Sequence, residues 1–146
     1  MTNIRKMNNK PYIINLPRIL DARGNLSVIE QGKALPFDIK RSYWIYDVPG
    51  GESREGHAYH SACEFIVALS GSFEIETISG DGVKESFLLT RSYYGLFIPP
   101  LCWRTLKNFS TNSLALIISS TPYLPEDYIT DYEQFKRIAS GTHHGL

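Results

Sequence analysis

Short apolar or alternating runs, broken by turn residues, extend along almost the whole chain and constrain its fold more than any other feature. Alternation of apolar and polar side chains is typical of half-buried strands, and Gly, Pro, Asn and Asp between such runs are typical of turns. We predict about nine strands, at residues 12–16, 25–30, 41–48, 64–69, 72–78, 83–89, 94–98, 102–106 and 114–120. Many short strands at regular spacing favour a sandwich or a barrel.

Only the end of the chain shows a helical pattern. Thr130 and Glu133 have the spacing of a capping box, in which two side chains satisfy free N–H groups of the first helical turn. Apolar residues recur here at a spacing of three and form one stripe, made of Ile129, Tyr132, Phe135 and Ile138. We predict a helix over about residues 131–139, followed by a flexible tail over residues 140–146.

The length and the charge balance exclude several classes of protein. The chain has 146 residues, which fits a single domain over residues 1–146. Basic and acidic residues number 15 each, so no net field attracts nucleic acid or an anionic membrane. No apolar run approaches the roughly 20 residues of a membrane span, and the first residues lack the apolar region of a signal peptide. Cys63 and Cys102 lie in apolar runs, as reduced thiols of a cytoplasmic protein do.

The segment EGHAYHSACEF, residues 55–65, has the spacing of a metal-binding motif without all of its ligands. His57 and Tyr59 occupy the H-x-H positions of the first cupin motif, and Glu64 and Gly71 follow at its remaining spacings. The second cupin motif is degraded, with Arg104 where its histidine would stand. The chain therefore resembles a cupin, which implies an all-β fold: a double-stranded β-helix (jelly-roll) barrel, here with a short C-terminal helix.

The residues at the ligand positions do not suit a metal ion. Cupin metal sites use three His and one Glu, whereas this chain has His57, Tyr59, Glu64 and Arg104. A guanidinium stays protonated and has no lone pair to donate, so Arg104 would repel a divalent cation. His60 does not replace a ligand, because alternation along a strand points it away from His57. We therefore predict no metal.

Fixed organic charge can support a different chemistry in such a site. His57 can act as a general base near neutral pH, and Arg104 can stabilise an oxyanion or a phosphate. This combination suits enolisation, in which a base removes a proton next to a ketone while cations hold the enolate oxygen. It also suits plain binding of an anionic ligand.

Five stretches of the chain, taken together and in order, resemble one family. They are LDARGNLSVIE (residues 20–30), PFDIKRSYWIYDVPGGESREGHAYH (36–60), ALSGSFEI (68–75), GLFIPPLCW (95–103) and DYITDYEQFKR (127–137). The family is that of the nucleotide-sugar 3,4-ketoisomerases, the WxcM-like group within the cupins. The resemblance covers about residues 20–138.

This resemblance implies an isomerase that converts dTDP-4-keto-6-deoxyglucose into its 3-keto isomer. In the family, the product passes to an aminotransferase and an acyltransferase, in deoxysugar biosynthesis for surface glycans such as the lipopolysaccharide O-antigen. The resemblance also implies that neither a metal nor a nicotinamide cofactor is used, and that the enzyme is a homodimer with exchanged strands. The catalytic base of the family is the first His of its H-x-H pair, which matches His57.

The implied mechanism assigns further roles. His57 takes the C3 proton, a cis-enediol forms across C3 and C4, and a proton returns to C4. Tyr59 replaces the second family His, so delivery of the C4 proton passes to Tyr59, to water or to His57 alone. Arg104 completes the predicted catalytic set, and Arg23 and Arg104 are the candidates for selecting the face of C4 that is protonated. The predicted substrate-binding residues are Arg23, Arg41, Tyr43, Arg54, Glu64 and Trp103.

Most of these residues also have a structural interpretation. His57 could be a hydrogen-bonded core histidine, and Tyr59 could only pack its strand. Glu64 could accept a hydrogen bond from the ligand or pair with an inward arginine, and the second interpretation is slightly favoured. The same choice between ligand contact and packing or solvation applies to Arg41, Arg54 and Trp103.

Three other functions are compatible with a cupin barrel to different degrees. A nucleotide-sugar 3,5- or 5-epimerase uses similar base chemistry, but those enzymes are usually longer and pair their His with an Asp that we do not find near His57. A non-catalytic cupin that binds sugar nucleotides would explain the presence of Tyr59. A metal-dependent cupin dioxygenase is disfavoured by Arg104.

Overall fold

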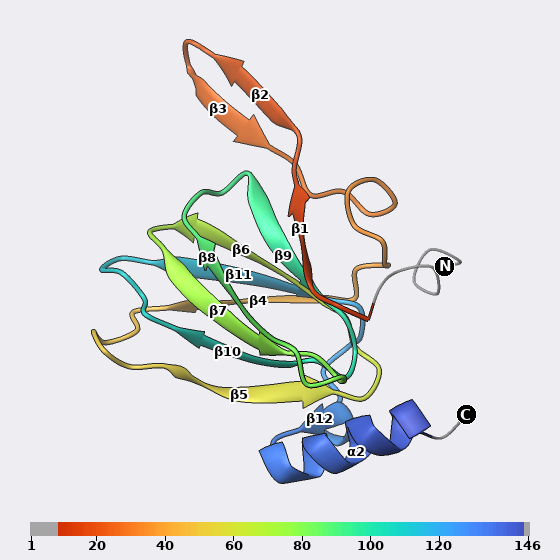
Figure 1. Cartoon of the computed structure of the whole chain (residues 1–146). Coiled ribbons are helices and arrows are strands. Elements are labelled where there is room, and N and C mark those ends of the chain that lie inside the picture. The colour runs from red at the N-terminus through yellow and green to blue at the C-terminus, as the bar shows by residue number, and fades with distance from the viewer. Residues whose placement is uncertain (1–8, 145–146) are drawn as a thin grey trace.

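The computed structural model describes residues 9–144, except for the side chains of residues 55 and 142–144. Two five-stranded antiparallel sheets form the body of the molecule (Figure 1). The first sheet has the strand order β1 (Tyr12–Asn15), β9 (Tyr94–Ile98), β6 (Glu64–Ser70), β11 (Leu114–Ser119) and β4 (Arg41–Tyr46). The second has the order β12 (Tyr128–Ile129), β5 (Arg54–Tyr59), β10 (Trp103–Lys107), β7 (Phe73–Ile78) and β8 (Lys84–Leu89). The predicted all-β jelly-roll class, with a C-terminal helix, is confirmed.

The buried apolar residues form three clusters, and alternation along the strands of the first sheet separates two of them. The main core lies between the two sheets and contains buried side chains such as Ile66, Ile75 and Leu106. A second cluster lies on the other face of the first sheet, where Phe37 packs against Phe65 and Phe97 among others. Because neighbouring residues of one strand point to opposite faces, the strands that bury these clusters also place every second residue inside the barrel.

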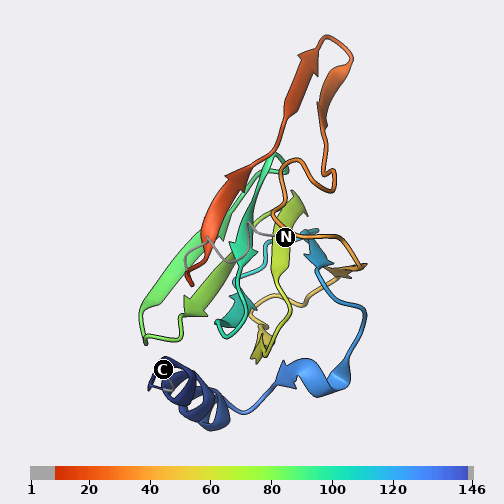
Figure 2. The same ribbon diagram turned by 90° about the vertical axis from the view of Figure 1, so that its right-hand side faces the viewer.

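The C-terminal segment covers the outer face of the second sheet (Figure 2). A short 3-10 helix, η1 (Pro125–Asp127), precedes β12, and α2 (Tyr132–His144) follows. Phe135 and Ala139 of α2 are buried against Ala58 of β5. The predicted helix end at residue 139 is wrong, because the helix continues over residues 140–144. This continuation contains Gly141, and glycine is an unfavourable residue inside a helix. Residues 145–146 of the predicted tail lie outside the described residues.

Three strands are absent from the sequence prediction. One is β5, which has no predicted range, although the expected facing of His57, Tyr59 and His60 already assumes a strand here; its sequence REGHAY contains a glycine and charged residues and lacks an apolar run. Another is the two-residue strand β12, and the third is β2 (Arg18–Asp21), which pairs with β3 (Gly24–Ser27). The β2–β3 hairpin projects away from the barrel (Figures 1 and 2). Its strands carry no buried residue. Most of β3 falls in the predicted strand at residues 25–30, whereas β2 was not predicted.

No helix among residues 9–144 is long and apolar enough to cross a membrane.

Candidate functional site

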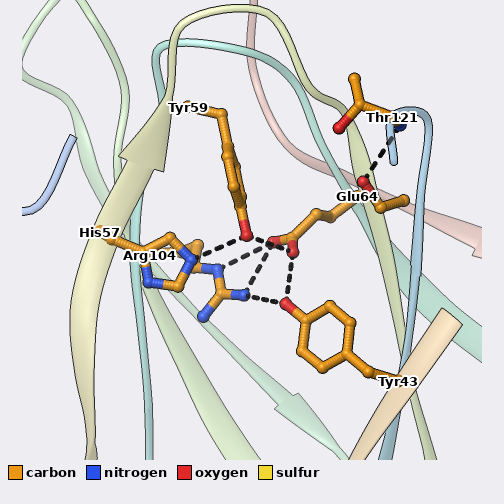
Figure 3. A network of polar contacts seen from close by, with 7 residues as sticks. Tyr43, His57, Tyr59, Glu64, Arg104 and Thr121 are labelled. Carbon is orange, nitrogen blue, oxygen red and sulfur yellow. Dashed lines mark hydrogen bonds and ion pairs between the residues drawn. The ribbon is translucent and has the colours of Figure 1, made fainter. Parts of the chain in front are cut away.

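Five polar side chains from four strands meet inside the barrel (Figure 3). His57 and Tyr59 come from β5, Glu64 from the start of β6, Arg104 from β10 and Tyr43 from β4. His57 and Arg104 are directly paired positions of neighbouring strands. Strand alternation places all five on the inner faces of the sheets, so the site lies between the two sheets.

A buried ion pair is the centre of this cluster. Arg104 donates from Nε to Oε1 of Glu64 at 2.9 Å, and its Nη2 lies 2.8 Å from the same oxygen. The two side chains are only 3% and 1% exposed. The preferred sequence interpretation of Glu64, as the partner of an inward arginine, is therefore confirmed. The charge of Arg104 is neutralised inside the protein, as burial requires.

Two tyrosines satisfy the second carboxylate oxygen. Tyr43 donates to Oε2 of Glu64 at 2.6 Å, and Tyr59 donates to the same oxygen at 3.0 Å. Arg104 Nη2 also donates to the Tyr43 hydroxyl at 3.1 Å. On the other side of Tyr59, the hydroxyl lies 3.1 Å from Nε2 of His57. A continuous hydrogen-bonded path thus runs from the ion pair to the histidine.

The electrostatics keep the ion pair charged and the tyrosines neutral. Burial alone would raise the pKa of Glu64, but Arg104 and the Tyr43 hydrogen bond outweigh it and hold that pKa below its ordinary value. Burial would lower the pKa of Arg104, but Glu64 raises it above its ordinary value. Burial and the Glu64 charge both raise the pKa values of Tyr43 and Tyr59 well above that of a free phenol. At neutral pH, Tyr59 is therefore a hydroxyl and not a phenolate.

Arg41 of β4 has two buried donor atoms without a partner among the described residues. It shares the inner face of β4 with Tyr43, and its guanidinium carbon lies 5.3 Å from the Tyr43 ring centroid and 5.4 Å from that of Tyr123. Its Nε and Nη2 are buried and have no hydrogen-bond partner among the described residues. Buried donors of a cation without an acceptor are costly, so these atoms suit an anionic ligand group.

The sequence prediction missed two tyrosines of the segment after β11. The Tyr128 ring lies 5.2 Å from His57 and 4.7 Å from Tyr59, centroid to centroid, and Tyr123 lies 5.9 Å from Tyr128. Asp127 holds this segment in place, because its carboxylate accepts bonds from Ser61 N, Ser61 Oγ and Ala62 N at 3.0, 2.8 and 3.1 Å. This segment has no recognisable local motif, since the contact with residues 61–62 is made only in the folded chain.

Three residues that were predicted to contact the substrate lie outside this cluster. Trp103 occupies the opposite face of β10 from Arg104 and packs on Tyr132 and Phe135 of α2, so the prediction that it lines the sugar site is not met. Arg54 is exposed at the start of β5. Arg23 lies on the projecting hairpin, where its side chain is 91% exposed and paired with Asp21 at 2.9 Å. Within one chain, Arg23 and Arg54 therefore do not reach His57.

The donor set of the cluster does not fit a metal ion. Among the described residues, no group of three or more His, Cys, Asp or Glu side chains is arranged as metal ligands. Both oxygens of Glu64 are already engaged by cationic or hydroxyl donors, and a guanidinium faces them. This arrangement is suited to acid–base chemistry at His57 and to binding of an anion at Arg41.

The comparisons with known proteins agree with this geometry. Residues 8–140 match the model of the family described as FdtA, WxcM-like, C-terminal. The chain belongs to this family. Within it, a curated relative from Aneurinibacillus thermoaerophilus, a TDP-4-oxo-6-deoxy-alpha-D-glucose-3,4-oxoisomerase, is 36% identical over 131 residues, which cover 90% of this chain and 92% of the relative.

Solved structures of sugar 3,4-ketoisomerases resemble most of the chain. The TDP-quinovose 3,4-ketoisomerase WlaRB of Campylobacter jejuni has a TM-score of 0.82 and 36% identity, covering 87% of this chain and 97% of that one. The sugar 3,4-ketoisomerase QdtA of Thermoanaerobacterium thermosaccharolyticum, solved in complex with TDP, has a TM-score of 0.86 and 30% identity, covering 90% and 96%.

Proposed function

We propose that this WxcM-like protein is a nucleotide-sugar 3,4-ketoisomerase that converts TDP-4-keto-6-deoxyglucose into the 3-keto isomer. The strongest support is the position of His57, at the end of a hydrogen-bonded path that runs through Tyr59 to Glu64. The relatives of this chain are 3,4-oxoisomerases and 3,4-ketoisomerases. The reaction needs one positioned base and stabilisation of an enolate. The cluster offers both.

The proton balance of the reaction requires no external reactant. His57 takes the proton from C3, and the electron pair of that C–H bond forms the C3–C4 double bond while the C4 oxygen gains a proton. The resulting enediol loses the proton of its C3 oxygen. The C3 oxygen then forms a double bond to C3, and the electron pair of the C3–C4 double bond takes up a proton at C4. The ketone is now at C3. The Tyr59 hydroxyl, 3.1 Å from Nε2 of His57, is placed to orient the imidazole ring during this sequence.

Arg41, rather than Arg104, is our candidate to hold negative charge of the substrate. Arg104 donates from Nε and Nη2 to Glu64 and Tyr43, so we assign it a positioning role in place of the predicted catalytic one. Arg41 retains two buried donors and lies beside Tyr43 and Tyr123. These donors would serve an enolate oxygen or a phosphate of the nucleotide. The complex of QdtA with TDP supports a TDP-linked sugar as the substrate.

We further propose that two chains form a homodimer through the β2–β3 hairpin. Ile19, Leu20 and Leu26 of this hairpin are 55%, 57% and 53% exposed, which is unusual for neighbouring large apolar side chains. A second copy would bury them, and an exchanged hairpin would give Arg23 a route to the partner's site. The family resemblance also implies a homodimer with exchanged strands.

The dimer predicts a particle of twice 16.6 kDa, or about 33 kDa, in light scattering after size-exclusion chromatography. Leu20→Asp should shift the particle towards the monomer, because it places a charge in the apolar contact. Leu88→Asp is the matched control, since Leu88 is a similarly exposed leucine of β8, and it should leave the mass unchanged. A wild-type mass near 16.6 kDa at assay concentration contradicts the dimer.

The cellular setting follows from the chemistry and is part of the proposal. Two buried cysteines, Cys63 and Cys102, are unpaired, which supports a reducing compartment such as the cytoplasm. A 3-keto sugar is the substrate that an aminotransferase requires. This supports a place in deoxysugar biosynthesis for a surface glycan such as the O-antigen of lipopolysaccharide.

The experiment that tests the proposed function locates the ketone. TDP-4-keto-6-deoxyglucose labelled with ¹³C in the sugar is incubated with the protein, and ¹³C NMR follows the carbonyl signal. We expect the carbonyl to move from C4 to C3. A carbonyl that stays at C4 with inverted C3 or C5 indicates an epimerase, and an unchanged sugar indicates a protein that only binds the nucleotide.

A further inference from the structure

The segment between β11 and β12, residues 120–127, is held in place at both of its ends. It leaves the first sheet at β11 and joins the second sheet at β12 (Figures 1 and 2). At its start, Ser120 Oγ accepts a hydrogen bond from Cys63 N at 2.8 Å, and Ser120 N donates to Cys63 O at 3.0 Å. At its end, the Asp127 carboxylate accepts bonds from the backbone of residues 61–62. Both anchors lie on the connection between β5 and β6, so the segment is fixed beside the site.

Tyr123 lies between these two anchors, and its side chain is 65% exposed. Its ring centroid lies 5.9 Å from that of Tyr128, at an interplanar angle of 66°, and the Tyr128 ring in turn lies 5.2 Å from the His57 ring. The three rings therefore form a row that begins at the candidate base and ends at the surface. Because the segment is already fixed at both ends, a ligand that contacts Tyr123 has little chain entropy to overcome.

Arg41 is a half-buried cation whose charge the described side chains leave uncompensated. Glu64 and Arg104 neutralise each other. Among the side chains that the structure describes, Arg41 has no carboxylate within ion-pair distance, and its Nε and Nη2 have no hydrogen-bond partner. Its guanidinium carbon lies 5.3 Å from the Tyr43 ring centroid and 5.4 Å from that of Tyr123. Arg41 therefore lies between the hydrogen-bonded cluster, to which Tyr43 belongs, and the exposed ring of Tyr123.

We propose that Arg41 and Tyr123 form a nucleotide subsite, in which Arg41 binds the diphosphate and the Tyr123 ring stacks on the base. In a sugar linked to a nucleoside diphosphate, the diphosphate joins the sugar to the nucleoside. The protein has the same order, with His57 for the sugar, Arg41 next and Tyr123 outermost. This order assigns Arg41 to the diphosphate and not to the enolate oxygen. The inference rests on the proposed function where it places the sugar at His57.

The test measures the affinity of the full chain for TDP and for inorganic pyrophosphate, which has a diphosphate without a base. Calorimetry gives the affinity for TDP, and competition against TDP gives that for pyrophosphate. Tyr123→Ala should weaken TDP binding about 5–150-fold, the equivalent of about 1–3 kcal/mol for one stacked base, and leave pyrophosphate binding within about twofold. Tyr123→Phe keeps the ring and should keep the TDP affinity within about twofold. Arg41→Met should weaken the binding of both ligands about tenfold or more, because it removes charged hydrogen-bond donors.

Tyr46→Ala is the matched control, because Tyr46 is a similarly exposed tyrosine, at 61%, on the outer face of β4. It should leave both affinities unchanged. An unchanged TDP affinity in Tyr123→Ala overturns the stacking of the base, and so does an equal loss in Tyr123→Ala and Tyr123→Phe, which would assign the contact to the hydroxyl. The assignment of the diphosphate is overturned if pyrophosphate does not displace TDP from the wild type, or if Arg41→Met weakens neither ligand.

Activity distinguishes a failure of this subsite from a failure of the proposed function. With TDP-4-keto-6-deoxyglucose, Tyr123→Ala should raise KM more than it lowers kcat, because the ring contacts the base and not the reacting carbons. TDP binding that depends on Tyr123, in a protein that does not move the ketone, supports the subsite and shows that the proposed function has failed. Ketone transfer with a KM that Tyr123→Ala leaves unchanged shows instead that the subsite is wrong.

Discussion

Replacing His57 by Asn is expected to lower the rate of ketone transfer by about 10²–10⁴-fold, the usual contribution of a general base. The amide side chain can still form a hydrogen bond with Tyr59, but it cannot accept a proton at neutral pH. Binding of TDP should change little, because the donors that we propose for an anionic group belong to Arg41 and not to His57. Initial rates measured by NMR and TDP affinity measured by calorimetry separate the two effects.

His60→Asn is the matched control for this prediction. It makes the same chemical change three residues along the chain, at an exposed side chain of the loop after β5. Its rate should stay within about twofold of the wild type. If the two variants lose activity equally, or if His57→Asn retains full activity, then His57 is a structural residue and the site needs another base.

Replacing Arg104 by Met is expected to destabilise the fold by about 3–5 kcal/mol, because it leaves the buried carboxylate of Glu64 without its cation. In the wild type, the pKa of Glu64 is lowered, so its contribution to stability is present above the unfolded-state pKa and is lost as pH falls. Without Arg104, burial dominates and raises that pKa instead. The variant should therefore lose more stability at pH 7 than at pH 5, as urea unfolding at fixed protein concentration can measure.

The double variant Glu64→Gln/Arg104→Met is the control for the charge effect. It removes both charges, while the Gln oxygen can still accept hydrogen bonds from the tyrosines. We expect it to recover more than half of the lost stability, since buried pairs contribute little net stability when both partners are replaced together. If the double variant is as unstable as Arg104→Met and shows no difference between pH 5 and 7, the lost stability comes from packing of the arginine side chain. It then does not come from the unpaired carboxylate of Glu64.

The inner face of the barrel could be predicted from the sequence because alternation along strands is a local property. Alternation predicts His57 and Tyr59 on one face and Arg41 and Tyr43 on one face. Figure 3 shows His57, Tyr59 and Tyr43 pointing into the site, and Arg41 lies on the same side of β4 as Tyr43. The same rule separates Trp103 from Arg104, since neighbours on a strand cannot both face inward. Trp103 therefore contacts α2, which covers the other side of β10.

The remaining features depend on contacts between distant segments. Tyr128 lies beside His57 because Asp127 accepts hydrogen bonds from residues 61–62. No local sequence pattern predicts this contact between distant segments. The projecting β2–β3 hairpin lacks a buried face, so neither its pairing nor its separation from the barrel was predicted. Arg23 was expected near the substrate, and its distance from the site in one chain follows directly from that hairpin.

The most direct test of the account is proton NMR of TDP-4-keto-6-deoxyglucose with the protein in deuterated water. Base-catalysed enolisation at His57 predicts a 3-keto sugar that carries deuterium at C4, and its coupling constants will report the configuration at that carbon. Retention of the C4 ketone with deuterium entering at C3 or C5 would contradict 3,4-ketoisomerisation and indicate an epimerase. A sugar that neither moves its ketone nor exchanges any proton would leave the cluster around His57 as a binding site only.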